Sequence, residues 1–325
     1  MNSILASFEL RGLLSYLVTR MKLRFLDKRS SGPTKTTVVI LGQKVNLDLM
    51  DLEQKYLAAD CVREPENLIV YRAIADSGLV DTFIDVGANC GHVAASVMNN
   101  FAQVLLFEPN PKLAKLLRDI FGTQSNITIR ECAIVDEASV GKLSLTVPDE
   151  SSGLATLGGT DLSKQHDRVH TYDVRASTFA TEVEGFSVKN AYIKIDVEGF
   201  EANIIESAKA LINRERPIVG FEALSNEAAL SCARLFNDYV FYCARFGFLE
   251  NDGALSRSIP GIMKALIFGA RIEVLILQNM EDGNLNNFSQ IYSVPIEKIE
   301  AFEKSILTYA AANPIFNFKS LKTWS

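Results

Sequence analysis

The chain of 325 residues carries 33 basic and 39 acidic side chains, a net charge of −6, and 48% of its residues are hydrophobic. This apolar fraction is enough for a sizeable core in one large domain or two small ones, which excludes extensive disorder. The acidic balance argues against a general nucleic-acid binder, because such proteins are usually basic.

Cysteine content and the apolar runs bear on the cellular location. Five cysteines, an odd number without a Cys-x-x-Cys pair, fit reduced thiols in a cytoplasmic protein better than a disulfide framework, and they offer no cysteine zinc site. No His, Asp or Glu spacing resembles a strong metal site, so we expect no metal. The apolar runs are shorter than the ~20 residues of a membrane span, and we expect no signal peptide.

The N-terminal segment is distinguished by its charge. Residues 1–36 hold seven basic and two acidic side chains, a net of +5, whereas the remainder is acidic. Residues 1–29 interleave Leu, Phe and Ile with Arg and Lys, which predicts a basic amphipathic helix. Such a helix can make a peripheral contact with an anionic membrane, or it can pack on the acidic remainder or on a second subunit. Both interpretations stay open, and the sequence does not indicate the oligomeric state.

Residues 37–80 are expected to pack on the core. A short hairpin is predicted over Val38–Leu47, turning at Gly42-Gln43, and residues 51–77 are predicted to be helical with an interruption near Pro65.

From residue 82, apolar strands alternate with helices. The predicted strands are Thr82–Val86, Val104–Phe107, Ile127–Cys132, Ala191–Ile195, Pro217–Phe221, Tyr239–Ala244 and Glu273–Gln278. The predicted helices are residues 92–100, Pro111–Phe121, Glu201–Leu211 and residues 296–311. This alternation predicts an α/β fold with a doubly wound, mostly parallel sheet over residues 81–280, followed by a helical extension over residues 281–325.

One long insertion, residues 136–190, interrupts the alternation. It holds a predicted strand at Lys142–Val147, the small-residue run Ser151-Ser152-Gly153, and a polar stretch with His166 and His170. Long irregular insertions between β/α units are often functional, although a solvated surface loop fits this composition as well.

The segment from Phe83 to His92 indicates a nucleotide-type site. A buried strand enters a Gly-x-Asn-x-Gly turn, Gly87 to Gly91, and then a helix, as at the carboxyl ends of a doubly wound sheet. The spacing differs from the GxGxxG pattern of dinucleotide sites. Asp85, two residues before the first glycine, suits a cofactor with an amine and a carboxylate, which describes S-adenosylmethionine.

Two further segments follow other strands. Glu108-Pro109 lies about 20 residues after the first turn, where an acid can accept hydrogen bonds from both ribose hydroxyls. Lys194-Ile195-Asp196-Val197-Glu198-Gly199 ends a strand beside the first turn. Its charges are costly there unless they act or pair. In the structural alternative, Lys194 neutralises Asp196, while Glu198 and Glu201 favour the start of the helix.

These three segments closely resemble the FkbM family of S-adenosylmethionine-dependent methyltransferases, over roughly residues 80–225. The resemblance implies the seven-stranded class I methyltransferase sheet with its last strand antiparallel, a place that Glu273–Gln278 suits. It also implies O-methylation of a sugar, glycan or polyketide-type hydroxyl. One departure is that the family's threonine-leucine-aspartate-aspartate stretch is replaced by Arg175–Ala180, so its carboxylates are absent or supplied by Asp173 or Glu182.

The expected site follows from these segments. The cofactor-binding residues are Asp85, Gly87, Ala88, Asn89, Gly91, Glu108, Pro109, Ala133 and Asp196. The catalytic candidates are Asp196 and Glu198 as bases, with Lys194 beside them, followed by His92 and then by His166 or His170.

Other functions remain as alternatives. A non-catalytic binding module could use the same scaffold. A nicotinamide-dependent oxidoreductase is disfavoured because the GxGxxG pattern is missing. A DNA or amine methyltransferase is disfavoured because the Asn/Asp-Pro-Pro-aromatic stretch that such enzymes often place after the fourth strand is replaced by Asp196-Val197-Glu198-Gly199.

Overall fold

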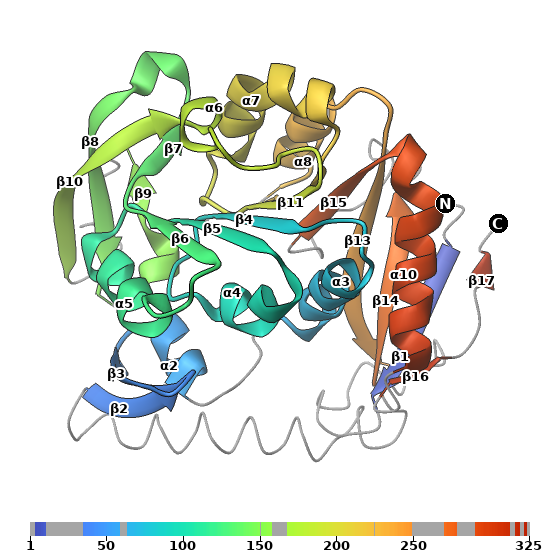
Figure 1. Ribbon diagram of the computed structural model, residues 1–325, viewed down its shortest axis with the longest axis horizontal. Helices are drawn as coiled ribbons and strands as arrows, with labels where there is room; N and C mark the ends of the chain where they lie inside the picture. The colour runs from blue at the N-terminus through green and yellow to red at the C-terminus, as the bar shows by residue number, and fades with distance from the viewer. Residues whose placement is uncertain are drawn as a thin grey trace, which may run out of the picture.

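The apolar strands predicted from residue 82 onward form one large mixed sheet in the computed structural model (Figure 1). The structure describes residues 4–10, 35–58, 64–149, 151–157, 168–223, 225–248, 270–277, 290–312, 316–318 and 322–323. Within these residues the strand order is β16-β1-β14-β13-β15-β12-β11-β4-β5-β6, with β17 beside β1.

The central part of this sheet is the parallel unit that the sequence predicted. It comprises β4 (Thr82–Val86), β5 (Gln103–Phe107), β6 (Ile127–Arg130), β11 (Ala191–Ile195) and β12 (Ile218–Glu222). Neighbouring strands pair in parallel, with β4 between β5 and β11. The chain adds β5 and β6 on one side of β4, and β11 and β12 on the other. The sheet is therefore doubly wound, with a change of direction between β4 and β11.

Helices cover both faces of the sheet (Figure 1). One face is covered by α3 (Pro65–Asp76), α4 (His92–Val97), α5 (Pro111–Phe121) and α10 (Ile299–Ala312). The other face is covered by α6 (Phe179–Glu182), α7 (Glu201–Glu215) and α8 (Asn226–Ala233). Alternate strand residues serve the two faces, as Phe83 and Ile84 of β4 show, because successive strand side chains point to opposite sides.

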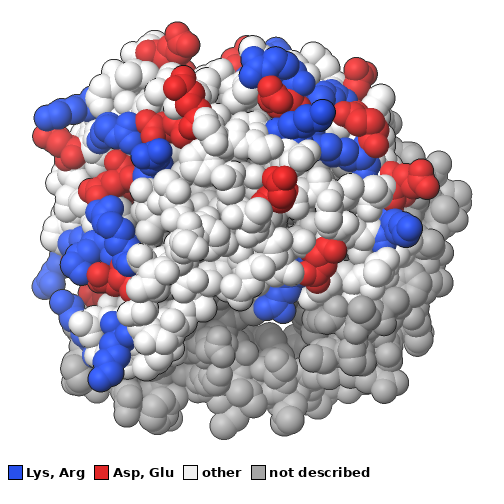
Figure 2. Space-filling model, in the orientation of Figure 1, with Lys and Arg blue, Asp and Glu red and all other residues white. Residues whose placement is uncertain are grey.

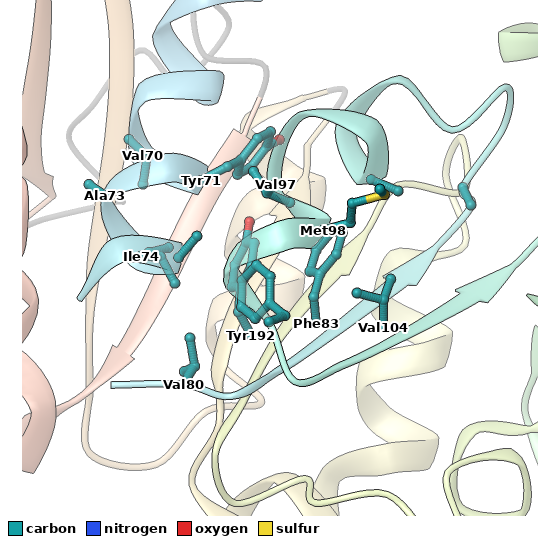
Figure 3. Close-up of a cluster of buried hydrophobic side chains, with 14 of the residues drawn as sticks. Val70, Tyr71, Ala73, Ile74, Val80, Phe83, Val97, Met98, Val104 and Tyr192 are labelled. Atoms are coloured by element: carbon teal, nitrogen blue, oxygen red, sulfur yellow. The ribbon is translucent and has the colours of Figure 1, made fainter. Parts of the chain in front are cut away.

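The apolar core between the sheet and the helices α3, α4, α5 and α10 is rich in aromatic side chains (Figure 3). Phe83 stacks between Phe101 and Tyr192, with ring centroids 5.4 and 5.7 Å away. Tyr71 of α3 contacts the Tyr192 ring, with centroids 5.9 Å apart, and Val70, Ala73 and Ile74 of the same helix are also buried. This packing fixes α3 against the strands that carry the glycine turn.

The antiparallel strand of the core was assigned to the wrong segment. We predicted that Glu273–Gln278 would take this place, but β14 (Ala270–Leu277) lies further out, beside β13 (Tyr239–Phe248). The antiparallel strand between β12 and β13 is β15 (Gln290–Pro295). Gln290, Tyr292 and Ser293 interrupt its apolar pattern although the whole strand is buried. Residues 281–325 therefore contribute a core strand as well as a helix.

The helix predicted for residues 1–29 is wrong where the structure describes it. Ile4–Leu10 forms β1, which pairs antiparallel with β14 and on its other side with β16 (Phe316–Phe318) and β17 (Lys322–Thr323). An edge strand such as β14 offers unpaired backbone groups, and pairing with them outweighs the local helical preference. The rest of the predicted helix, residues 11–29, lies outside the described residues.

The insertion is more regular than predicted. β8 (Gly141–Pro148) and β10 (Val169–Thr178) form a long antiparallel pair, joined by β7 (Ala133–Val135) and β9 (Thr156–Leu157) in a four-stranded sheet. The third predicted strand, Ile127–Cys132, accordingly ends at Arg130, after which β7 enters the second sheet.

The N-terminal hairpin is confirmed. β2 (Lys35–Ile40) and β3 (Gln43–Asp48) turn at Leu41 and Gly42, one residue earlier than predicted, with φ of 50° and 80°. The predicted helical region divides into α2 (Leu52–Ala58) and α3. Short 3₁₀ turns are η2 (Met98–Asn100), η3 (Glu137–Ser139), η4 (Ser152–Leu154) and η7 (Ile296–Lys298).

Two further observations concern thiols and surface. The described cysteines, Cys90, Cys132, Cys232 and Cys243, are free and buried, and Cys61 lies outside the described residues. None of the described helices is both long and apolar enough to span a bilayer.

Figure 2 shows basic and acidic side chains mixed around one face, with a broad uncharged area between them. On this face, the described residues thus show no extended field of one sign.

Candidate active site

A cavity of about 190 Å³ lies at the carboxyl ends of β5, β4, β11 and β12, where the winding of the sheet reverses. Ligands of open α/β sheets bind at this type of position. The predicted site residues that line the cavity are Asp85, Gly87, Ala88, Asn89, His92, Glu108, Pro109, Ala133, Lys194, Asp196 and Glu198. Of the residues predicted to bind the cofactor, Gly91 alone is not in the wall.

The turn after β4 requires glycine at position 87. Gly87 has a φ of +87°, and a Cβ built there would lie 1.9 Å from the backbone oxygen of Asp196. The Asp196 N–H donates to Val86 O at 3.0 Å, which holds the two turns together. The turn after β4 and the turn after β11 are therefore in backbone contact at the point where the winding of the sheet reverses.

Gly91 was expected to allow the close approach of a ligand or of other backbone. The close approach is by α5, because a Cβ at this position would lie 2.5 Å from Cε2 of Phe121. Its φ of +79° places it at the left-handed start of α4. Gly91 therefore allows α4 and α5 to pack behind the cavity wall.

The carboxyl group of Glu108 is held by the backbone. Its Oε2 accepts a hydrogen bond from Asn89 N and its Oε1 from Asn110 N, both at 2.8 Å. Glu108 is 5% exposed, and burial raises the pKa of its carboxyl to about 7. Each oxygen of a carboxylate can accept two hydrogen bonds, so each has capacity for one further donor from the cavity.

Lys194 links the two sides of the cavity. Its buried Nζ lies 2.9 Å from Asp196 Oδ2 and 3.3 Å from Asp85 Oδ1. Burial lowers the pKa of Lys194, but the two carboxylates outweigh this effect and raise it overall. Burial has the opposite effect on an acid, and it raises the pKa of Asp85 to about 6. Lys194 is therefore a permanent counterion, which suits electrostatic support better than proton abstraction.

Glu222, the last residue of β12, was missed by the sequence analysis. It lines the cavity next to Asp196 and Glu198, and one oxygen from each of the three carboxyls lies within 4.8 Å of the others. Burial and then the proximity of Asp196 raise the pKa of Glu222 to about 10. The available signal was its place directly after the predicted strand Pro217–Phe221, at the same edge of the sheet as Asp196. Among the described residues, this trio has a spacing that would also admit a cation.

The turn after β11 separates the roles of two glutamates. Glu201 Oε1 accepts from Val197 N at 3.0 Å and its Oε2 accepts from Gly199 N at 3.0 Å, so this first residue of α7 holds the turn that precedes the helix. Glu198 has a φ of +52° and lines the cavity. Glu201 therefore has a structural role at the start of α7, whereas Glu198 lies in the cavity wall.

The small-residue run of the insertion reaches the glycine turn. Ser152 Oγ donates to Asn89 Oδ1 at 3.0 Å, and Ser152 N donates to Asp51 Oδ2 at 2.7 Å. Asp51 also accepts from Gln54 N at 2.9 Å, at the start of α2. Three segments distant in sequence thus close one side of the cavity.

The two sides of the cavity differ in polarity. Apolar wall residues come from β5, β7, β8 and β9 and their flanks: Phe107, Cys132, Ala133, Ile134, Leu145, Ala155 and Leu157. Beside β11, β12 and α3, the wall carries Glu64, Asp196, Glu198 and Glu222, with Tyr71 among them.

The remaining candidates lie elsewhere. His170 forms a 2.9 Å pair with Asp149 and is outside the cavity wall, and His166 lies outside the described residues. Asp173 is exposed on β10. Glu182 pairs with Arg175, which lowers the pKa of its carboxyl. Neither acid lines the cavity.

The strand order, with β15 antiparallel between β12 and β13, and a cavity at the carboxyl ends of the parallel strands define a class I methyltransferase fold. The chain belongs to the FkbM methyltransferase family: the Methyltransferase FkbM domain matches residues 85–248, about half of its length. The matched region begins at Asp85 and includes Glu108, Asp196 and Glu222.

Solved structures similar to this chain include several methyltransferases. A methyltransferase FkbM from Methylobacillus flagellatus KT is 13% identical with a TM-score of 0.33; the match covers 79% of this chain but 58% of that protein. An O-methyltransferase from Bacillus cereus in complex with SAH is 10% identical with a TM-score of 0.34, covering 80% and 91%. A SAM-dependent O-methyltransferase from Thermotoga maritima is 10% identical with a TM-score of 0.35, covering 83% and 81%. No curated protein sequence matches the chain.

Proposed function

We propose that this protein is an S-adenosylmethionine-dependent O-methyltransferase whose acceptor is a hydroxyl on a sugar, glycan or polyketide-type small molecule. The observation that carries the proposal is the buried Glu108 carboxyl at the end of β5. Both of its oxygens are oriented by backbone N–H groups and keep capacity for two more donors, which matches the two hydroxyls of a ribose.

The chemistry of the cavity fits the rest of the cofactor. Asp85 is buried and its Oδ1 is paired with the Lys194 ammonium at 3.3 Å, and a carboxylate keeps acceptor capacity beyond one such contact, which suits the ammonium group of the methionine part. The apolar wall beyond Glu108 offers a surface for an adenine ring. When bound, S-adenosylmethionine supplies an electrophilic methyl group.

The chain's own residues would then orient the acceptor and remove its proton. Holding the acceptor oxygen in line with the methyl carbon provides most of the rate enhancement. Asp196 and Glu198 lie at the adjoining strand end, within the same cavity, and a carboxylate there can take the hydroxyl proton. His92, in the first turn of α4, is the next candidate for this role.

The charge of the wall narrows the acceptor class. On the side of β11, β12 and α3, the cavity presents four carboxyl groups and the ammonium of Lys194, which is already paired with Asp85 and Asp196. An anionic acceptor would meet uncompensated negative charge. The acceptor is therefore expected to be uncharged or cationic.

Cofactor binding provides the direct test. S-adenosylmethionine should raise the melting temperature of the full chain, and NADH should not, because only a ligand that binds the native state stabilises it. Stabilisation by NADH alone would favour the oxidoreductase alternative. Binding of S-adenosylmethionine without transfer of its labelled methyl group to any neutral, cationic or anionic glycan or polyketide would favour the non-catalytic binding module.

A further inference from the structure

Tyr71 of α3 places an aromatic ring in the wall of the cavity, on the side that carries the carboxyl groups of Glu64, Asp196, Glu198 and Glu222. The proposed function gives this residue no role. The ring is buried, with 4% of the residue exposed, and its centroid lies 5.9 Å from that of Tyr192 (Figure 3) and 6.1 Å from that of Tyr292. These neighbours hold the ring against the sheet.

The hydroxyl of Tyr71 is also held. It donates a hydrogen bond to Oε1 of Gln290 on β15. Because the ring packs on its neighbours and the hydroxyl is bonded, the orientation of the side chain is fixed before any ligand enters. A binding group that is already oriented loses less conformational freedom when the ligand arrives.

Gln290 itself is an unusual residue for its place. It is 3% exposed, and its Nε2 has no acceptor among the described residues. The amide packs closely on β12, since a Cβ at Gly220 would lie 2.6 Å from this nitrogen. A buried N–H without an acceptor is destabilising, and an apolar side chain would avoid that cost. Within the described structure, the contact that favours glutamine here is the bond to Tyr71.

A second chain of hydrogen bonds joins β15 to α3. The Tyr292 hydroxyl donates to Asn67 Oδ1 at 2.9 Å, and Asn67 Nδ2 donates to Glu64 Oε2 at 2.8 Å. Glu64 directly precedes α3 and lines the cavity. The strand thus holds a carboxyl group and an aromatic ring in the same wall, and both kinds of group attract a cation.

We propose that the Tyr71 ring contacts the sulfonium of S-adenosylmethionine and favours this cation over the uncharged S-adenosylhomocysteine, with Gln290 as the residue that positions the ring. The face of a tyrosine ring attracts a cation, most strongly where water is excluded. The product lacks the charge on sulfur, so the same contact is weaker for it and its release is favoured. This inference rests on the proposed function and deepens it.

The test compares the two ligands by calorimetry on the full chain and needs no acceptor. Tyr71→Leu should lower the ratio of S-adenosylmethionine affinity to S-adenosylhomocysteine affinity by about 2–30-fold. The ratio isolates the sulfonium, because the two ligands share every other group and a general loss of structure weakens both alike. The control Phe302→Leu removes a buried ring of the same core that is outside the cavity wall, and it should leave the ratio unchanged.

The positioning role of Gln290 is tested by a double-mutant cycle. Tyr71→Phe keeps the ring and removes the hydroxyl, and Gln290→Met removes its acceptor at similar size. Each should lower the ratio by less than Tyr71→Leu. The double variant should lower it no further than the single variants, because both changes break the same bond. Additive losses would contradict a role of Gln290 through Tyr71. These variants keep the ring in the core, so they give a result even where Tyr71→Leu does not fold.

A second cationic probe separates charge from shape. Sinefungin carries an amine in place of the S-methyl group, and its affinity relative to S-adenosylhomocysteine should also fall in Tyr71→Leu. A fall for S-adenosylmethionine alone would show that the ring packs on the methyl group without recognising charge, which overturns the proposal. An unchanged ratio for both probes overturns it as well. Failure of the wild type to bind any of the three ligands would instead refute the proposed function, and this contact with it.

Discussion

The two sides of the central sheet are built in different ways. On the β4–β5 side, most of the predicted cofactor residues come from two short segments, Asp85–Gly91 and Glu108-Pro109, with 16 residues between them in sequence. On the β11–β12 side, the wall combines residues as distant as Tyr71 and Glu222. A common cofactor needs a fixed local geometry, whereas an acceptor pocket can be assembled from whatever elements surround the strand ends.

The largest expected effect lies on the β11–β12 side and concerns chemistry. Asp196→Asn and Glu198→Gln keep the shape of the side chain and remove its charge. Loss of the base should lower turnover by about 10²–10⁴-fold while the cofactor still binds. Methyl transfer and calorimetry on each variant separate these two properties. If both variants keep full activity, the acids are structural and His92 becomes the candidate base.

The next effect concerns the junction between the two sides. Gly87→Ala would place a Cβ 1.9 Å from Asp196 O at a φ of +87°, so the expected loss is about 2–5 kcal/mol of unfolding free energy. Gly78→Ala is the matched control, since its φ is +69° but nothing lies within 4 Å of the new Cβ. It should lose only about 1–2 kcal/mol. Equal losses in urea denaturation would show that the close approach is unimportant.

On the β4–β5 side, Glu108→Ala should weaken S-adenosylmethionine binding by about 10–100-fold, because two ribose hydroxyls lose their acceptor.

The pKa of Glu108 is raised to about 7, and hydroxyl donors favour its ionised form. Affinity should therefore fall as the pH drops below about 7, with one proton released on binding. Calorimetry in buffers of different ionisation enthalpy measures that proton. A pH-independent affinity would contradict the role of Glu108.

The smallest effect concerns the side closed by the insertion. Ser152→Ala removes the hydrogen bond to Asn89 Oδ1 and should cost about 1 kcal/mol of stability. It should also lower S-adenosylmethionine affinity several-fold, since Asn89 N orients Glu108. Ser207→Ala, whose hydroxyl bonds within α7, provides the control for losing a serine hydroxyl far from the turn. An affinity change as large in the control would remove the special role of Ser152.

The sequence predicted the features that depend on local pattern. The strand before Gly87, the helix Pro111–Phe121 and the strand Ala191–Ile195 were recovered with their bounds, because each combines an apolar run with clear breaking residues. Asp85, Glu108 and Asp196 follow from the same logic, since the carboxyl ends of parallel strands share one edge.

The sequence could not predict features that arise from distant pairing. β15 contains Gln290, Tyr292 and Ser293 and has no alternating pattern, so only its neighbours β12 and β13 identify it as a strand. Ile4–Leu10 was predicted as helix because the pairing partner that makes it a strand lies more than 250 residues away. Glu222 was missed because an acid at the end of a strand carries no motif of its own.

The place of β1 has a consequence for handling the protein. This strand lies between β14 on one side and β16 and β17 on the other, so segments near the beginning and the end of the sequence are joined in one ribbon (Figure 1). Deletion of the first ten residues would remove the common neighbour of three strands and leave two rows of backbone N–H and C=O groups open. Exposed strand edges recruit other chains. A shortened protein should therefore self-associate through β14, and an affinity tag is safer when a flexible spacer separates it from this ribbon.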